Sequence, residues 1–139
     1  MLLDTDFIID LMTRHEGAVA LLNDIEASDE PQFVSSVTLF ELYHSLARVD
    51  QPDERRQNIQ AVLEDRPVLD ADSDVMTTAG QLHGRLVADG NEVGPLDVII
   101  GATGLVHGES VVTGNEADFE RIFAAAEPPL AVGLTTYDK

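Results

Sequence analysis

The sequence predicts an α/β fold in which helices cover both faces of a mostly parallel sheet. Short apolar runs recur along the 139 residues, and stretches with apolar residues at helical spacing separate them. Continuous apolar runs are typical of strands buried on both faces, as in parallel sheets. Strands that alternate with helices also favour parallel pairing. We therefore expect a sheet of four to five strands in a single domain that spans residues 1–139.

The predicted strands are short. Leu2-Leu3 is the first apolar run, and Asp4 stands where that strand would end. The other strands are predicted at residues 32–35, 67–69, 110–113 and 130–134.

The predicted helices fill the intervals between the strands. Apolar spacing, capping residues and breakers place them at residues 7–12, 18–25, 37–49, 52–63, 73–86, 96–106 and 116–125. Asp6 is expected to cap the first helix. Phe40, Tyr43 and Ala47 share one face of the third helix, which we expect in the core or at a dimer interface.

The helix predicted at residues 96–106 is apolar nearly all round, which indicates a buried helix. Gly101 and Gly104 within it predict close packing against a neighbouring element.

Composition excludes several classes of site. There is no cysteine, so disulfides, thiolate catalysis and sulfur-ligated metals are excluded. No Gly-x-Ser-x-Gly elbow and no phosphate-binding P-loop is present. No apolar run approaches the ~20 residues that cross a bilayer, and no signal peptide is recognisable. A cytoplasmic protein that does not bind membranes is the expectation.

The charge balance is strongly acidic. The chain has 26 acidic and 8 basic residues, a formal net charge of −18, and Lys139 as its only lysine. Acids are spread over the whole length, which favours a surface adapted to very high salt, as in a halophile, where charges are screened within ~3 Å at 1 M. The alternative is a protein that imitates nucleic acid or binds a basic partner.

Four acids stand where a shared site is possible. Asp4 follows the first strand, Glu41 lies in the helix after the second, Asp97 begins the buried helix, and Asp118 follows the fourth strand. Helices that follow parallel strands begin at the carboxyl edge of the sheet, where open α/β sheets bind ligands. Converging carboxylates repel one another unless a cation lies among them. Oxygen ligands select a hard ion, Mg²⁺ or Mn²⁺.

Each acid also has a purely structural interpretation. Asp4 ends a strand, Thr38-x-x-Glu41 fits a capping box, and Asp97 and Asp118 favour helix dipoles. The case for a site therefore depends on the whole set of acids.

The four acids and the residues around them resemble the motifs of a known protein family. Leu3-Asp4-Thr5, Thr38-x-x-Glu41, Asp97-x-x-Ile100-x-Ala102 and Val112-Thr113-x-Asn115-x-x-Asp118-Phe119 together resemble the PIN-domain ribonucleases, in size and order their VapC-type toxins. The resemblance implies a three-layer α/β/α fold and Mg²⁺-dependent endonucleolytic cleavage of RNA. It also implies a VapB-like antitoxin and a homodimer.

By position, the resemblance makes Asp4, Glu41, Asp97 and Asp118 the catalytic, metal-binding acids. Thr113 and Asn115 would be supporting polar groups, with Asp6 beside them where the family more often has Ser, Asn or Thr.

Two other functions compete. Asp4-Thr5-Asp6 resembles the opening motif of haloacid-dehalogenase-type phosphatases, although the Gly-Thr that usually follows is replaced by Phe7-Ile8. The third possibility is a catalytically inactive PIN-like binding module.

Overall fold

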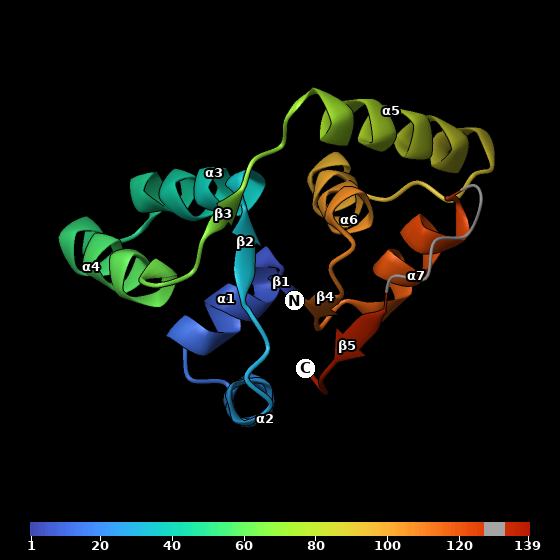
Figure 1. Ribbon diagram of the computed structural model, residues 1–139. Helices are drawn as coiled ribbons and strands as arrows, with labels where there is room; N and C mark the ends of the chain where they lie inside the picture. Colours follow the sequence, from blue (N-terminus) through green and yellow to red (C-terminus); the bar gives the residue numbers. More distant parts are fainter. Residues whose placement is uncertain (127–132) are drawn as a thin grey trace.

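A computed structural model describes residues 1–126 and 133–139, and it contains one sheet of five parallel strands (Figure 1). The strands are β1 (Leu2–Leu3), β2 (Phe33–Ser35), β3 (Val68–Leu69), β4 (Val111–Thr113) and β5 (Leu134–Thr136). Their order is β3-β2-β1-β4-β5, and every neighbouring pair is parallel. The predicted α/β class and parallel sheet are confirmed.

The predicted strands agree with this sheet except at the last one. Four predicted runs overlap β1 to β4. Most of the run predicted at 130–134, and the break expected at Pro128-Pro129, lie outside the described residues. The described strand β5 begins at Leu134 and continues to Thr136, beyond the predicted end.

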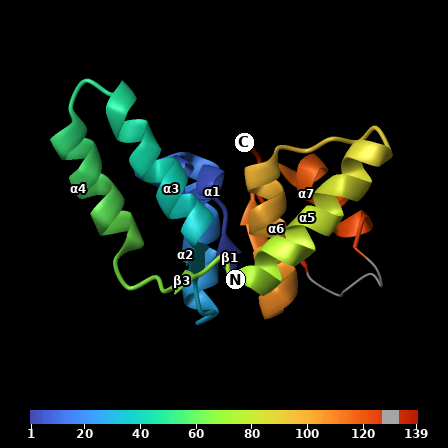
Figure 2. The ribbon, with the colours of Figure 1, turned by 90° about the horizontal axis from the view of Figure 1, so that it is seen from above.

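Helices cover both faces of the sheet, which gives the expected three layers (Figure 2). The helices are α1 (Thr5–Met12), α2 (Glu16–Ala27), α3 (Ser36–His44), the 3-10 turn η1 (Ser45–Arg48), α4 (Pro52–Leu63), α5 (Ser73–Ala88), α6 (Pro95–His107) and α7 (Glu116–Ala124). Helices α1 to α4 lie to one side of the strands in Figure 2, and α5 to α7 to the other.

Neighbouring residues of each central strand point to opposite faces, and both faces are apolar. Leu2 and Val111 pack with α5, α6 and α7, whereas Leu3 and Val112 pack with α1 to α4. All four side chains are fully buried. Because both faces need apolar residues, these strands read as unbroken apolar runs rather than as alternating ones.

Helix α6 packs closely through its glycines, as predicted. A Cβ on Gly101 would lie 2.8 Å from Cγ2 of Ile122 in α7, and one on Gly104 would lie 2.9 Å from the Glu109 carbonyl oxygen. These small residues let α6 approach both α7 and the turn before β4.

Of the two places expected for the face of Phe40, Tyr43 and Ala47, the core is wrong and the dimer interface stays a prediction. Phe40 is 62% exposed and Tyr43 40% exposed, and Ala47 is exposed as well. Helix α3 instead turns Val37, Thr38 and Leu42 inward. The helix also ends at His44, before the predicted end at 49.

Across residues 1–126 and 133–139, none of the helices combines the length and the apolar character needed to cross a membrane.

The strand order creates a switch point beside β1. The chain passes from β1 to β2 and β3 on one side, and then returns to β4 and β5 on the other. Connections that leave two neighbouring strands in opposite directions open a crevice at their carboxyl ends, where α/β proteins bind ligands. In this chain the two strands are β1 and β4.

Candidate active site

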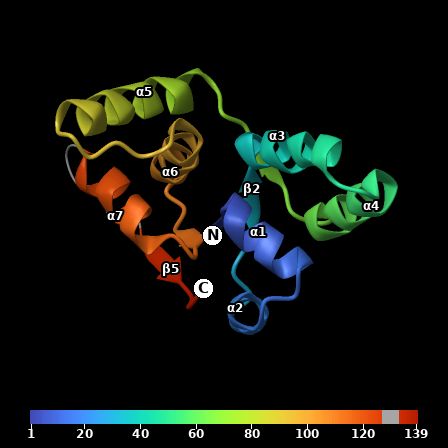
Figure 3. The ribbon, with the colours of Figure 1, turned by 180° about the vertical axis from the view of Figure 1, so that it is seen from behind.

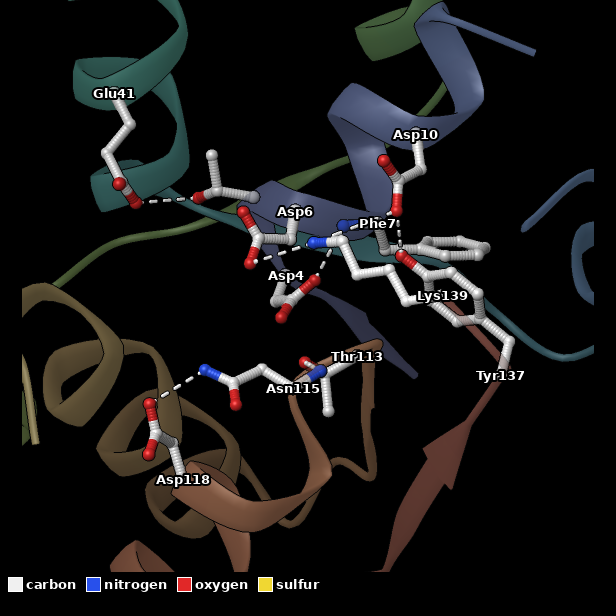
Figure 4. A network of polar contacts seen from close by, with 11 residues as sticks. Asp4, Asp6, Phe7, Asp10, Glu41, Thr113, Asn115, Asp118, Tyr137 and Lys139 are labelled. Carbon is white, nitrogen blue, oxygen red and sulfur yellow. Dashed lines mark hydrogen bonds and ion pairs between the residues drawn. The ribbon is translucent and has the colours of Figure 1, made fainter. Parts of the chain in front are cut away.

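The predicted site residues lie around the carboxyl ends of β1 and β4. Asp4 directly follows β1, and Thr113 ends β4. The Asp4 backbone N–H donates to the Val112 carbonyl oxygen at 3.0 Å, which keeps the two strand ends together. In Figure 4 the side chains of Asp4, Asp6, Asn115, Asp118 and Glu41 surround one opening.

Asp4 itself caps helix α1. Its backbone is extended, and its Oδ1 accepts a hydrogen bond from the Phe7 N–H at 2.8 Å. The expectation that Asp6 is the cap is wrong, because the helix begins at Thr5, immediately after the two-residue strand. Asp6 therefore falls in the first turn, where its side chain is 48% exposed.

Asp4 is a buried carboxyl group with little positive charge to balance it. The residue is 2% exposed. Burial raises the pKa of Asp4 to about 7, and the negative charges of Asp6 and Asp97 add to the rise. Hydrogen bonds from Thr113 and from the Phe7 N–H oppose it. Such a shift at a crevice is typical of functional carboxylates.

Thr113 is oriented toward Asp4 by the loop that follows β4. Its Oγ1 accepts from the Asn115 N–H at 2.9 Å, and the side chain is fully buried. The Thr113 hydroxyl also lies close enough to Asp4 to lower the pKa of that carboxyl group. The supporting role of Thr113 stays a prediction.

Glu41 is held by the neighbour of Asp4. The Thr5 hydroxyl donates to Glu41 Oε1 at 2.7 Å, and Thr5 and Thr38 share a hydrogen bond of 3.0 Å. The capping box is absent, because Ser35 caps α3 by accepting from the Val37 N–H. The carboxyl group of Glu41 is therefore tied to the start of α1 and not to its own helix.

Asp97 lies in the first turn of α6 and feels the other acids. Burial first, and then the charges of Asp6, Glu41 and Asp118, raise the pKa of Asp97 to about 6. Lys139 acts in the opposite direction. All of these acids thus lie close enough to Asp97 to act on it electrostatically.

Asp118 lies in the first turn of α7 and is held on both oxygens. Asn115 donates through Nδ2 to Oδ2 at 2.8 Å, and Arg121 Nη1 lies 3.3 Å from Oδ1. Asn115 occupies the N-cap position of α7 but makes no side-chain cap bond. Its amide orients Asp118 instead.

The acids do not form a ready cage for a cation. Within the part of the chain that the structure describes, no three acidic or histidine side chains are grouped tightly enough to hold a metal ion as they stand. The donor set nevertheless fits Mg²⁺. This ion is usually bound through one or two carboxylates, with waters and substrate phosphates as its other ligands. Asp4 and Asp97, whose pKa values are raised first by burial and then by neighbouring acids, are the two best candidates.

Three residues of this edge were not among the predicted site residues. Thr5 and Thr38 connect α1 to Glu41, and Lys139 Nζ lies 3.4 Å from Asp6 Oδ2. The two threonines fall within the motifs, so their spacing gave a signal. Lys139 gave none, because its partner lies more than 130 positions earlier in the chain.

The chain is similar in sequence to a known protein family and to characterised proteins. A family model described as the PIN domain matches residues 1–124. The chain is 34% identical over 89 residues to a tRNA(fMet)-specific endonuclease VapC from Shigella flexneri, a match that covers 64% of this chain and 67% of that protein.

Solved structures show the same fold. VapBC2 from Rickettsia felis, bound to a DNA fragment from its promoter, superposes with a TM-score of 0.82 at 20% identity, over 99% of this chain and 100% of that one. DNA-bound VapBC from Salmonella typhimurium superposes with a TM-score of 0.79 at 26% identity, over 97% and 96%.

Proposed function

Because this chain belongs to the PIN-domain family, we propose that it is an Mg²⁺- or Mn²⁺-dependent endoribonuclease, the toxin of a type II toxin–antitoxin pair. The observation that carries the proposal is the pair Asp4 and Asp97. Both carboxyl groups lie beside the β1/β4 switch point, and burial and neighbouring acids raise the pKa of both. A divalent cation is the ligand that relieves this charge.

Asp4 and Asp97 would hold the ion, with Glu41 and Asp118 as further ligands. A bound divalent ion supplies an acidified water and neutralises charge on the phosphate oxygens. The chain's own residues keep the ligands in position. Thr113 orients Asp4, and Asn115 orients Asp118.

Thr5 connects two of the proposed ligands. Its backbone directly follows Asp4, and its hydroxyl holds Glu41 at 2.7 Å. The hydroxyl of Thr5 therefore ties the Glu41 carboxyl group of α3 to the start of α1, where Asp4 lies. The expected reaction is hydrolysis of an RNA phosphodiester that leaves a 5′-phosphate and a 3′-hydroxyl.

The proposed partners are a VapB-like antitoxin and a second copy of the chain. Support comes from the VapBC complexes among the similar solved structures. The phosphatase alternative loses its basis, because the matching family model is the PIN domain. The remaining alternative, a catalytically inactive binding module, is distinguished from the nuclease by the cleavage experiment below.

The test is cleavage of RNA by the purified chain with Mg²⁺ or Mn²⁺. Initiator tRNA is the first substrate to test, because a similar VapC is named for tRNA(fMet). Asp4→Asn and Asp97→Asn should each lower the rate about a hundredfold or more, since a metal ion supplies several kcal/mol of charge stabilisation. Asparagine also caps helices well, so Asp4→Asn keeps the start of α1.

Asp53→Asn is the matched control, because it makes the same chemical change at an acid of α4 that is 94% exposed. Its rate should equal that of the wild type. Undiminished divalent-dependent cleavage in both site variants would refute the assignment of the acids. A wild-type chain that cuts no RNA with either ion would favour the inactive module.

A further inference from the structure

Residues 137–139 lie against the proposed catalytic edge after leaving β5. The Tyr137 hydroxyl donates to Asp10 Oδ2 at 2.5 Å. The Tyr137 ring meets the rings of Phe7 and His15 edge to face, with centroids 5.4 and 5.7 Å apart. Figures 1 and 3 show this end of the chain between β5 and the helices α1 and α2. Contacts on several sides thus hold the segment against α1.

The loop after β4 packs closely against this segment at a glycine. A Cβ on Gly114 would lie 3.0 Å from Cδ of Lys139 and 3.0 Å from Cζ and the hydroxyl of Tyr137. Gly114 stands between Thr113 and Asn115, the two supporting groups of the site. The stem of Lys139 therefore crosses the rim of the site itself.

The ammonium group of Lys139 reaches the acids of α1. Its Nζ lies 3.4 Å from Asp6 Oδ2 and 3.9 Å from Asp10 Oδ2. Figure 4 shows it extended over Asp4 toward Asp6. Its charge also acts on Asp97. The side chain is 45% exposed, and ion pairs of exposed side chains add little to stability. The ammonium group can therefore exchange these partners for another anion at little cost.

A phosphodiester strand approaching this edge meets strong repulsion. The chain has a formal net charge of −18, and the opening is bordered by carboxyl groups. Arg121 is paired with Asp118, itself a proposed ligand. Among the residues that the structure describes, Lys139 is paired only with acids of α1 outside the proposed ligand set, so it is the cation better placed to meet a phosphate.

We propose that Lys139 is a phosphate-binding residue of this site, contacting the RNA backbone beside the scissile bond. The inference rests on the proposed ribonuclease function and names a residue that the function did not include. RNA binding transfers the ammonium group from Asp6 and Asp10 to a phosphate oxygen, while Tyr137 keeps its bond to Asp10 and holds the segment in place.

The test compares Lys139→Gln, Lys139→Arg and Arg56→Gln. Arg56 is the matched control, because it is 46% exposed, is paired with Asp53 on α4 and carries the same charge. Lys139→Gln should raise KM for RNA about fourfold at 0.15 M salt with kcat nearly unchanged, as expected for the loss of one phosphate contact. Lys139→Arg should restore KM, and Arg56→Gln should match the wild type.

Binding gives a second readout that does not depend on turnover. In an Asp97→Asn background, fluorescence anisotropy of a labelled RNA strand measures Kd against salt concentration. The slope of log Kd against log salt should fall by about 0.7 when Lys139→Gln is added. A purely structural role for Lys139 would leave this slope unchanged.

The outcomes distinguish failure of the proposed role of Lys139 from failure of the proposed ribonuclease function. If the wild type cleaves RNA but Lys139→Gln behaves like Arg56→Gln in KM and slope, the role of Lys139 is refuted and the ribonuclease stands. If the wild type cleaves no RNA with either ion, both are refuted.

Discussion

At the scale of single residues, Asp4 shows that a structural role and a candidate catalytic role can belong to one side chain. The sequence offered these as alternatives: an acid that ends a strand or one that holds a metal. In the structure Oδ1 caps α1 by accepting from the Phe7 N–H, while the nearby Thr113 hydroxyl lowers the pKa of the carboxyl group. Capping fixes where the carboxyl group lies, and burial makes its charge costly. The cap therefore pre-positions the proposed ligand.

The raised pKa values of Asp4 and Asp97 predict how stability depends on pH. In the unfolded chain both groups ionise near the ordinary value of 3.8, whereas in the folded chain the pKa is about 7 for Asp4 and about 6 for Asp97. Between these values the folded state binds more protons than the unfolded state. The contribution of these two groups to the free energy of unfolding is therefore full below pH 4 and lost as pH rises toward 7.

Urea unfolding in metal-free buffer at pH 5 and pH 7.5 measures this effect. The free energy of unfolding should fall less in Asp97→Asn than in the wild type, by a difference on the order of 1 kcal/mol, because the amide does not titrate. Asp53→Asn again serves as the control and should follow the wild type. Equal pH dependence in Asp97→Asn and the wild type would mean that Asp97 ionises normally.

At the scale of elements, the sequence predicted best where the signal is local. Pro52 opens a helix as expected. Pro95, predicted to lie in the preceding loop, opens α6 one residue before the predicted start. The end of α3 was missed, because no Gly or Pro marks the change to the 3-10 turn at Ser45. The capping box expected from the spacing of Thr38 and Glu41 is absent, because Ser35, about one turn earlier, caps the helix.

The parts of the candidate site that escaped prediction depend on distant contacts. The bond from Tyr137 to Asp10 joins residues 127 positions apart, and periodicity carries no information at that separation. The bond from Thr5 to Glu41 spans 36 positions. The four acids were predicted as a set because each follows a strand, begins a helix or lies in a helix that follows a strand, and parallel topology brings such positions to one edge.

The close contact between α6 and α7 gives a prediction about packing. Gly101→Ala should lower the free energy of unfolding by about 1–3 kcal/mol, because the new methyl group would lie 2.8 Å from Ile122 Cγ2. The control is Gly80→Ala in α5, where a Cβ meets nothing within 4 Å. That variant should be about 0.5–1 kcal/mol more stable, since alanine favours helix. Denaturant midpoints measure both, and a neutral or stabilising Gly101→Ala would contradict the packing of α6 against α7.

At the scale of the whole molecule, strand order and charge act in opposite directions on the proposed reaction. The β1/β4 switch point gathers acids from α1, α3, α6 and α7 beside one crevice. Those acids suit a divalent cation, but a formal net charge of −18 repels the polyanionic substrate. For the proposed reaction, salt and bound cations would weaken this repulsion between the protein and RNA, and Lys139 would supply a positive charge at the rim of the site.

The spread of acids over the whole chain predicts that salt stabilises the fold. Self-repulsion among exposed carboxylates is screened over about 8 Å at 0.15 M salt but over about 3 Å at 1 M. The thermal midpoint should therefore rise steadily as KCl is increased from 0.15 M to above 1 M. Sucrose at equal osmolality is the control for general exclusion effects, and it should raise the midpoint less. The alternative, an acidic surface that imitates nucleic acid or awaits a basic partner, needs no concentrated salt to remain folded. A midpoint that is flat above 0.15 M KCl would favour that alternative over a salt-adapted surface.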